Sequence, residues 1–532
     1  AVLGAKLWIV QLYGSPLPMW DQWAEARSCF LPLAQGQFSL ATLFIPNNEH
    51  RIVLPKLLDV LLIQANGRWE PLVQMTANCL LHAVFAVALT TALWHFLGRQ
   101  KGWLVCALVA PFFVLPFGAE NTVWAFNSQH YFLSFCALLT LAGLGFARPG
   151  SVFWWLGLTA SIGGLFSMAS GFLAPAALVG LALLRLLKAR RWDWANGSLI
   201  LLGIAIITAG LAAMVHMPGD TALKAHSPSE FFVAWGRNLA WPFVNHALWL
   251  WPLLLLPLLV LLGLYLRPRF AAPAAAEFLF ALAGWSILQS AALAYGRANY
   301  GDGFPVSRYM DVLAWLTLAS LAAVWLLQKL YWDRPLAALI PWVLMVIVGF
   351  QLAYLSSVVV DQLLKPTLTA NLLGAERVQA YVTRWDKTDF LTEPTIHPDP
   401  KFIAGVLEEK ALVPLLPHAC LPAGQQPAPG PLDTLAASLY NHALFLLSTG
   451  LGLFAGLLLL GPARRDLIAL LLLLGCLGAS GAVWSQAPQD RATTFIQAET
   501  HLVTLCQLAG HPERAAWHAA RAAAYAHHLS EP

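Results

Sequence analysis

The chain has 532 residues, of which 58% are hydrophobic and only 11% are charged. In soluble domains roughly a quarter of all residues are charged, so this composition excludes a soluble globular protein. The formal net charge of +4 is small, and its basic residues gather in short loops, which indicates membrane topology and not nucleic-acid binding. Seven cysteines without a CxxC pair indicate neither a metal site nor a redox motif.

Long apolar runs follow one another along the chain, and each predicts a helix that crosses a membrane. They fall near residues 1–13, 72–97, 103–118, 131–147, 151–168, 172–187, 197–215, 241–265, 278–296, 310–328, 337–357, 441–461 and 466–485. The first run is shorter than the roughly 20 residues that a spanning helix needs, so we expect that helix to begin before Ala1. The sequence therefore predicts an all-α polytopic membrane protein with about 13 transmembrane helices.

The compact basic clusters between these runs all fall on one predicted side. They are Arg99 with Lys101, Arg148, Lys188 with Arg190 and Arg191, Arg267 with Arg269, Lys329 with Arg334, and Arg464 with Arg465. Since loops rich in Lys and Arg stay in the cytoplasm, the N-terminus is predicted inside and the C-terminus outside. The composition fits a bacterial inner membrane, for which the outer side is the periplasm.

The predicted periplasmic side holds the long and chemically mixed segments. In the first loop, 14–70, the stretches 24–35 and 51–65 have apolar residues at helical spacing and predict helices lying in the membrane interface. We divide the chain into a transmembrane core with that loop (1–357), a periplasmic region (358–438), the last two transmembrane helices (439–485) and a periplasmic helical tail (486–532). Whether Cys420 and Cys506 form a disulfide on this side stays open.

Four groups of ionisable and amide side chains lie on this same predicted side. Ionisable groups at a membrane are costly to bury, which makes them functional candidates. The groups are Trp20-Asp21-Gln22-Trp23, Asn48-Glu49-His50-Arg51, Glu120-Asn121-Thr122 through Asn127-Ser128-Gln129-His130, and Tyr295-Gly296-Arg297 through Ser307-Arg308-Tyr309.

These residue types suit group transfer from a lipid-bound phosphate donor. A carboxylate, Asp21 or Glu49, can take the proton of an acceptor hydroxyl. Arginines can hold a phosphate leaving group through forked, charge-assisted hydrogen bonds. The predicted substrate-binding residues are His50, Arg51, Glu120, Asn121, Gln129, Arg297, Ser307, Arg308 and Tyr309. Structural alternatives stay open, since Asp21 could cap a helix, Glu49 could pair with Arg51, and Arg308 could reach lipid headgroups.

The arrangement resembles the GT-C superfamily of glycosyltransferases, whose members have eleven to thirteen spans and a long first periplasmic loop with interfacial helices. The motifs quoted above are also similar to those of a bacterial group of uncharacterised GT-C-like membrane proteins. The resemblance covers most of the chain at the level of topology. It implies an inverting hexosyl- or pentosyltransferase that moves a sugar from a polyprenyl-phosphate donor to an envelope glycan such as lipopolysaccharide, to a lipid or to a protein. Asp21 occupies the position of the family's first-loop acid, with Glu49 as a second carboxylate, and Arg297 and Arg308 would face the lipid phosphate.

The sequence departs from the family at the paired acidic residues that many members carry in the first loop. Here Asp21 is followed by Gln22. Because a divalent cation prefers several oxygen ligands, we expect a reaction that needs no metal or other cofactor, and a divalent cation stays the alternative.

Two other functions stay open. An O-antigen ligase or polymerase would act on a lipid-pyrophosphate glycan, and the region 358–438 would then be the large late loop of such enzymes. A transporter of lipid or glycan is the other alternative. Transporters place ionisable residues at mid-depth in two related halves, whereas the predicted spans here contain few charges and no half-to-half repeat.

Overall fold

The computed structural model describes residues 1–98, 102–215, 218–243, 250–300, 305–331, 339–383, 397, 399–421, 426–460, 492–504, 506–507 and 512–530. These residues form helices joined by loops, and their one extended pairing is an isolated bridge between Asn47 and His50. The prediction of an all-α fold is confirmed for this part of the chain.

Seven of the described helices are long and apolar enough to cross a membrane. They are α6 (Pro71–Leu97), η4 with α9 (Ala125–Phe146), η5 with α11 (Ala169–Ala189), α12 (Trp194–Ala213), α15 (Pro273–Gly296), α16 (Ser307–Tyr331), and the continuous helix Ile340–Val382. Five shorter apolar helices accompany them, namely α1 (Val2–Tyr13), α7 (Gly102–Val114), α10 (Val152–Leu165), α14 (Trp251–Tyr265) and α22 (Ala443–Leu460). By helix length and hydropathy the chain is a multi-pass membrane protein.

These helices coincide with the predicted apolar runs from 1–13 to 441–461, and the last predicted run, 466–485, lies outside the described residues. Of the run predicted at 241–265, residues 244–249 lie outside the described residues, and α14 covers the run from Trp251 onward. The bundle is centred on α16, whose most apolar window is 94% buried. Small residues allow the close approach of helices that packing in a membrane requires. A Cβ added to Gly143 of α9 would lie 2.7 Å from Cα of Gly157 of α10.

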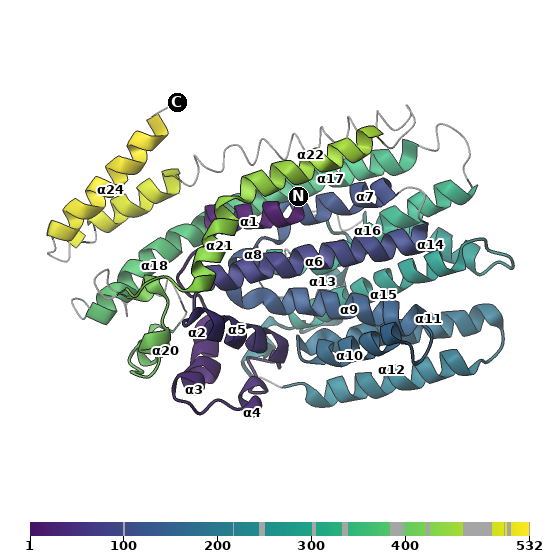
Figure 1. Cartoon of the computed structure of the whole chain (residues 1–532). Coiled ribbons are helices and arrows are strands. Elements are labelled where there is room, and N and C mark those ends of the chain that lie inside the picture. The colour runs from purple at the N-terminus through teal and green to yellow at the C-terminus, as the bar shows by residue number, and fades with distance from the viewer. Residues whose placement is uncertain are drawn as a thin grey trace.

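The helices of the first loop gather with two later helices at one end of the bundle (Figure 1, left). The first-loop helices are α2 (Asp21–Glu25), the π-helical turn η1 (Ala26–Phe30), α3 (Leu31–Ala34), α4 (Leu40–Leu43) and α5 (Val53–Asn66). The later helices are α18 (Lys365–Thr383) and α20 (Pro400–Leu407). Trp23, Phe30 and Trp69 share one buried cluster with Val378 and Ile403, so the region 358–438 packs on the first loop.

The expected boundary at residue 358 falls inside a helix. α17 (Ile340–Val359) continues through the π-helical turn η9 (Val360–Leu364) into α18 without a break. Beyond it, the short helices η10 (Val413–Leu415) and η11 (His418–Cys420) lead to α21 (Pro431–Asn441). Cys420 carries a free thiol that is buried in the same cluster as Trp69.

The remaining short elements connect the spanning helices. They are η3 (Pro116–Gly118), α8 (Glu120–Val123), η6 (Pro218–Leu223) and α13 (Pro228–Leu239). At the C-terminal end, a helix at 492–504 packs against α24 (Pro512–Ser530), with the rings of Phe495 and Tyr525 centred 5.0 Å apart.

Candidate functional site

A tight turn in the first loop carries two of the predicted residues, Glu49 and His50. The amide of Asn47 donates to the carbonyl of His50 at 2.9 Å, and the amide of His50 donates back at 3.0 Å. Asn48 has a φ of 49°, a left-handed conformation that Asn adopts more readily than most residues. Its side-chain amide donates to the Asp21 carboxylate at 3.3 Å, so the turn is tied to the start of α2.

The turn faces a cavity of about 440 Å³ between membrane helices. One part of the lining is polar and contains Glu49, His50, His130, Ser170, Lys224, Gln289, Tyr295, Arg297 and Tyr309. The other part is apolar and contains Leu133, Met168, Phe172, Leu173, Leu211, Met214, Val215, Leu293 and Val312. A cavity with apolar walls and a few convergent polar groups suits an amphiphilic ligand.

An ion pair dominates the polar part. Nη2 of Arg297 donates to Oε1 of Glu49, and both side chains are less than a fifth exposed, at 19% and 18%. Nε2 of His50 lies 3.7 Å from the same Glu49 oxygen. Glu49 therefore pairs with Arg297 across the cavity lining, and the alternative of a Glu49–Arg51 pair is not what the structure shows.

His50 is a neutral side chain with a defined orientation. Its Nδ1 accepts the backbone N–H of Ala169 at 3.2 Å, which leaves the ring proton on Nε2, facing Glu49. Burial lowers the pKa of His50, and the nearby Glu49 carboxylate opposes that shift only in part. The imidazole is thus uncharged at neutral pH and can donate one hydrogen bond toward Glu49.

Arg308 belongs to a second, deeper network that supports the cavity from behind. Its Nη1 donates to Glu120 at 2.6 Å, its backbone N–H donates to the same carboxylate at 3.1 Å, and Glu120 is 1% exposed. The side-chain amide of Asn121 donates to the Arg308 carbonyl at 2.8 Å and to Asp311 at 2.9 Å. Ser307 donates to the carbonyl of Phe117 at 2.6 Å. These bonds fix the start of α16, and so they place the side chain of Tyr309, which follows Arg308, in the cavity wall.

Three further predicted residues lie outside the cavity lining. Asp21 is partly exposed and bonded to Asn48. Arg51 donates to the carbonyls of Phe44 at 2.8 Å and Ala213 at 3.3 Å, so it joins the first loop to the end of α12. Gln129 is buried at the start of α9.

Lys224 and Gln289 line the cavity although the sequence analysis did not select them. The segment that carries Lys224 is bonded to the loop after α15: Ala225 N donates to Tyr295 O at 2.9 Å, and the Asn299 side chain donates to Lys224 O at 2.8 Å. Gln289 donates to the carbonyl of Ser170 at 3.3 Å. Gln289 could have been selected from the sequence, because a glutamine inside an apolar span is unusual. Lys224 could not, because its position at the cavity depends on a tertiary contact.

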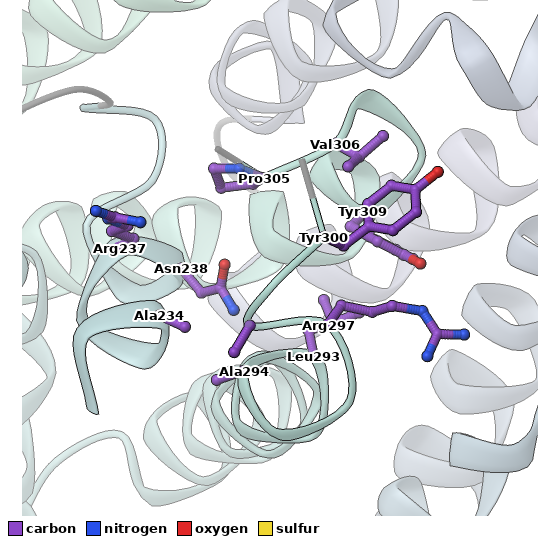
Figure 2. Close-up of a pocket in the computed structure, with 11 residues that line it drawn as sticks. Ala234, Arg237, Asn238, Leu293, Ala294, Arg297, Tyr300, Pro305, Val306 and Tyr309 are labelled. Carbon is purple, nitrogen blue, oxygen red and sulfur yellow. The ribbon is translucent and has the colours of Figure 1, made fainter. Parts of the chain in front are cut away.

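A smaller pocket of about 30 Å³ lies on the other side of Arg297. Figure 2 shows Asn238 of α13 facing the loop that carries Arg297, with Tyr300 and Tyr309 beside that loop, and Arg237 of α13 also lines the pocket. The volume suits one or two water molecules. Arg297 and Tyr309 line both the water-sized pocket and the large cavity, so these two residues separate the two spaces.

Three residues elsewhere have the composition of a metal site. Ligand atoms of Glu70, His418 and Asp433 all lie within 4.8 Å of one another. Each already has protein partners: His418 Nδ1 contacts Glu70, His418 Nε2 lies 3.1 Å from Arg68 Nη1, and Asp433 accepts the N–H of Gly430 at 2.7 Å. The Arg68 charge disfavours a cation, and the group serves to fasten the segment 418–433 to the first loop.

Two further sets of buried ionisable residues lie away from the cavity. Glu25, Lys56 and Asp59 are each at most 1% exposed and lie together inside the first loop, between α2 and α5. Lys6 of α1 and Asp311 of α16 are 0% and 5% exposed and interact inside the bundle. The sequence analysis had counted few charges within the spans and did not select either residue.

Comparisons of the chain with protein-family models, with curated proteins and with solved structures find no match.

Proposed function

We propose that the cavity is the donor site of a membrane-embedded glycosyltransferase that uses a polyprenyl-phosphate sugar. The observation that carries the proposal is the lining itself, which joins apolar side chains of membrane helices to Arg297, Lys224 and Glu49. The apolar walls would bury the first isoprene units, the two cations would hold the phosphate, and the carboxylate would face the reacting sugar.

In the proposed reaction, the acceptor hydroxyl attacks the anomeric carbon from the face opposite to the phosphate. A new carbon–oxygen bond forms, and the bond between the anomeric carbon and the phosphate oxygen breaks. The hydroxyl proton passes to a carboxylate, and polyprenyl phosphate leaves with the electron pair. Arg297 and Lys224 would stabilise the charge that develops on the phosphate, which supplies the electrostatic part of catalysis.

Either Asp21 or Glu49 can be the general base of this reaction. Asp21 remains the carboxylate that corresponds in position to the first-loop acid of GT-C enzymes. Glu49 is the one that lines the cavity, and Asn48 links the two residues through its bond to Asp21. On this geometry we favour Glu49 as the base, with Asp21 positioned to orient the acceptor or the turn.

The proposal includes the GT-C-like architecture of about thirteen spans, the N-in and C-out orientation and a bacterial inner membrane. The ends of the spanning helices support the orientation. α16 begins beside the cavity at Ser307 and carries the basic Lys329 in its last turn, and α11 begins near the cavity and carries Lys188 in its last turn. Basic residues therefore lie at the helix ends remote from the cavity, as they would with the cavity on the periplasmic side.

Turnover of a polyprenyl-phosphate sugar by the purified protein in lipid nanodiscs tests the proposal. We expect release of polyprenyl phosphate when a membrane lipid extract supplies the acceptor, and a loss of about 100-fold or more in Glu49→Gln, the usual range for removal of a general base. Asp21→Asn is compared in parallel, and Glu409→Gln, at an exposed residue, is the control. A protein that turns over lipid-pyrophosphate glycans and not the monophosphate donor would support the ligase alternative and contradict the proposal.

Transport is a second candidate because of one observation, the buried Lys6 and Asp311 inside the bundle. Ionisable residues at membrane depth often mark a substrate or ion pathway. Movement of a fluorescent prenyl-phosphate lipid across liposomes that contain the protein, abolished by Asp311→Asn, would favour this candidate.

A further inference from the structure

The ion pair between Glu49 and Arg297 in the cavity involves the carboxylate that we propose as the general base. Arg297 donates a hydrogen bond to Oε1 of the Glu49 carboxylate, which would take the acceptor proton. A cation in direct contact favours the ionised carboxylate and makes it a weaker proton acceptor. The resting arrangement in the structure therefore weakens Glu49 as a base.

Resting on the proposed function, we propose that the donor phosphate itself releases Glu49, by binding between Lys224 and Arg297 and drawing the Arg297 guanidinium away from the carboxylate. Glu49 would then be a stronger base when donor is present. Lys224 becomes a phosphate-binding residue, and the Glu49–Arg297 pair becomes a restraint on the base that the substrate relieves.

Lys224 is the cation that makes this exchange favourable. It lines the same cavity, and among the described residues no carboxylate lies within 4.0 Å of its ammonium group. Its backbone is held by Asn299, two residues beyond Arg297, so the two cationic side chains belong to one bonded loop assembly. A phosphate group between the two side chains would accept charge-assisted hydrogen bonds from both cations, whereas the Glu49 carboxylate accepts its bond from Arg297 alone of these two cations.

The charges of the lining balance through the proposed reaction. Glu49, Lys224 and Arg297 together carry one net positive charge, because His50 is held neutral by burial. The phosphodiester of a polyprenyl-phosphate sugar carries one negative charge, which brings the loaded cavity to neutrality. After transfer, Glu49 holds the proton and the leaving phosphate monoester carries the second negative charge between the two cations. The charge that Glu49 loses therefore appears on the phosphate, and no uncompensated charge is left in a partly buried site.

Binding of a prenyl phosphate without a sugar tests the inference apart from turnover. Radiolabelled farnesyl phosphate is titrated onto the full-length protein in nanodiscs, with farnesol as the ligand that lacks phosphate. We expect Lys224→Gln and Arg297→Gln to weaken farnesyl phosphate binding about tenfold or more, and Lys410→Gln, at an exposed lysine, to leave it unchanged.

The decisive variant is Glu49→Gln, which keeps the shape of the side chain and removes the competitor for Arg297. We expect it to tighten farnesyl phosphate binding by about threefold to tenfold, the value of a partly exposed ion pair. In an Arg297→Gln background the same change should have no effect. Simple repulsion between Glu49 and the phosphate would persist in that background, so the double variant separates the two explanations.

The outcomes distinguish failure of the phosphate-release mechanism from failure of the proposed transferase function. If the wild type binds farnesyl phosphate and Glu49→Gln weakens binding or leaves it unchanged, the release of Glu49 by phosphate is wrong and the proposed transferase stands. If Lys224→Gln binds as the Lys410→Gln control does, Lys224 is not a phosphate-binding residue. If the wild type binds farnesyl phosphate no better than farnesol, both the inference and the proposed donor class are overturned.

Discussion

At the scale of single residues, the Glu120–Arg308 pair fixes a helix that lines the cavity, although neither residue lines the cavity itself. The carboxylate is almost fully buried and accepts two hydrogen bonds from Arg308, whose guanidinium also stacks on Tyr309 at 5.1 Å from the ring centre. Both residues were predicted from the sequence as substrate contacts, and that prediction is untested. In the structure neither lines the cavity, and together they hold the start of α16 and with it Tyr309.

Replacing Glu120 by glutamine should therefore reduce stability. The variant leaves Arg308 largely buried without its counter-charge, and breaking such a pair costs about 3–5 kcal/mol. Thermal unfolding of the purified variant measures the loss, with Glu409→Gln as the matched control at an exposed position. A midpoint equal to that of the control would show that Glu120 is not needed for the fold and would favour a direct role in substrate binding.

The buried carboxylates of the first loop, Glu25 and Asp59, predict a pH dependence of stability. Burial raises the pKa of Asp59 to about 7, and burial together with the nearby Asp59 raises the pKa of Glu25 well above its ordinary value. Lys56, Asp21 and Cys29 are the other titratable groups that act on this pair. A raised carboxyl pKa means that the folded protein binds more protons than the unfolded chain, so stability falls as pH rises from about 4 to about 7.

Asp59→Asn should flatten that fall, because the amide carries no charge to bury. We expect the variant to be as stable as the wild type at pH 4 and more stable above pH 7, by about 1–3 kcal/mol. Unfolding midpoints across this pH range are the measurement. A wild-type profile that rises over the same range would contradict the assignment.

The residues of the site were predictable to the extent that they occur in local motifs. Glu49, His50, Arg297 and Tyr309 were all selected from the sequence, and all of them line the cavity. Lys224 was not selected, because only the bonds between Ala225 and Tyr295 and between Asn299 and Lys224 bring it to Arg297. Long-range contacts of this kind leave no periodic or compositional signal.

At the scale of helices, buried charges act between α1 and α16 in addition to the apolar packing of the bundle. Lys6 and Asp311 are both buried and interact electrostatically, without an ion pair within 4.0 Å. Lys6→Met removes a positive charge that acts on the buried Asp311 and should destabilise the protein by about 0.5–3 kcal/mol. The double variant Lys6→Met/Asp311→Asn should recover most of that loss, as measured by thermal unfolding in nanodiscs. Additive losses in the double variant would show that the two residues do not act as a pair.

Spanning helices were the elements that the sequence predicted best. A membrane helix needs a long apolar run, and such runs are visible without any tertiary information. The predicted ends of helices were less accurate where a helix continues beyond its apolar residues. The helix that begins at Ile340 continues to Val382, although its apolar composition ends near Val359, so the expected boundary at 358 falls within it.

At the scale of the whole molecule, His518 is one of the contacts between the C-terminal helices and the rest of the chain, and Phe495 packs against the main core. Its Nδ1 lies 2.6 Å from Glu499, and its Nε2 lies 3.7 Å from Glu376 of α18. Burial acts to lower the pKa of His518, but its bonds and charge interactions with Glu376 and Glu499 outweigh burial and raise it to about 9. This contribution to docking is complete below pH 6.5 and is lost as pH rises through about 9.

Hydrogen exchange of the C-terminal helices tests that attachment. His518→Gln should speed exchange in residues 512–530 at pH 7 by about tenfold, the effect of losing roughly 1.4 kcal/mol of local stability. His501→Gln, at an exposed histidine in the same segment, is the control. Equal protection in the two variants would mean that other contacts hold these helices.

The central claim, that the cavity binds a lipid phosphate, is tested most directly by photo-crosslinking. A polyprenyl phosphate with a diazirine on its first isoprene unit is irradiated with the protein in nanodiscs, and the labelled peptides are identified by mass spectrometry. We predict labelling that is concentrated on the cavity walls, near Phe172, Met214 and Leu293, and that excess farnesyl phosphate competes away. Labelling spread over the lipid-facing helices, at the level obtained with a diazirine prenol that lacks phosphate, would contradict it.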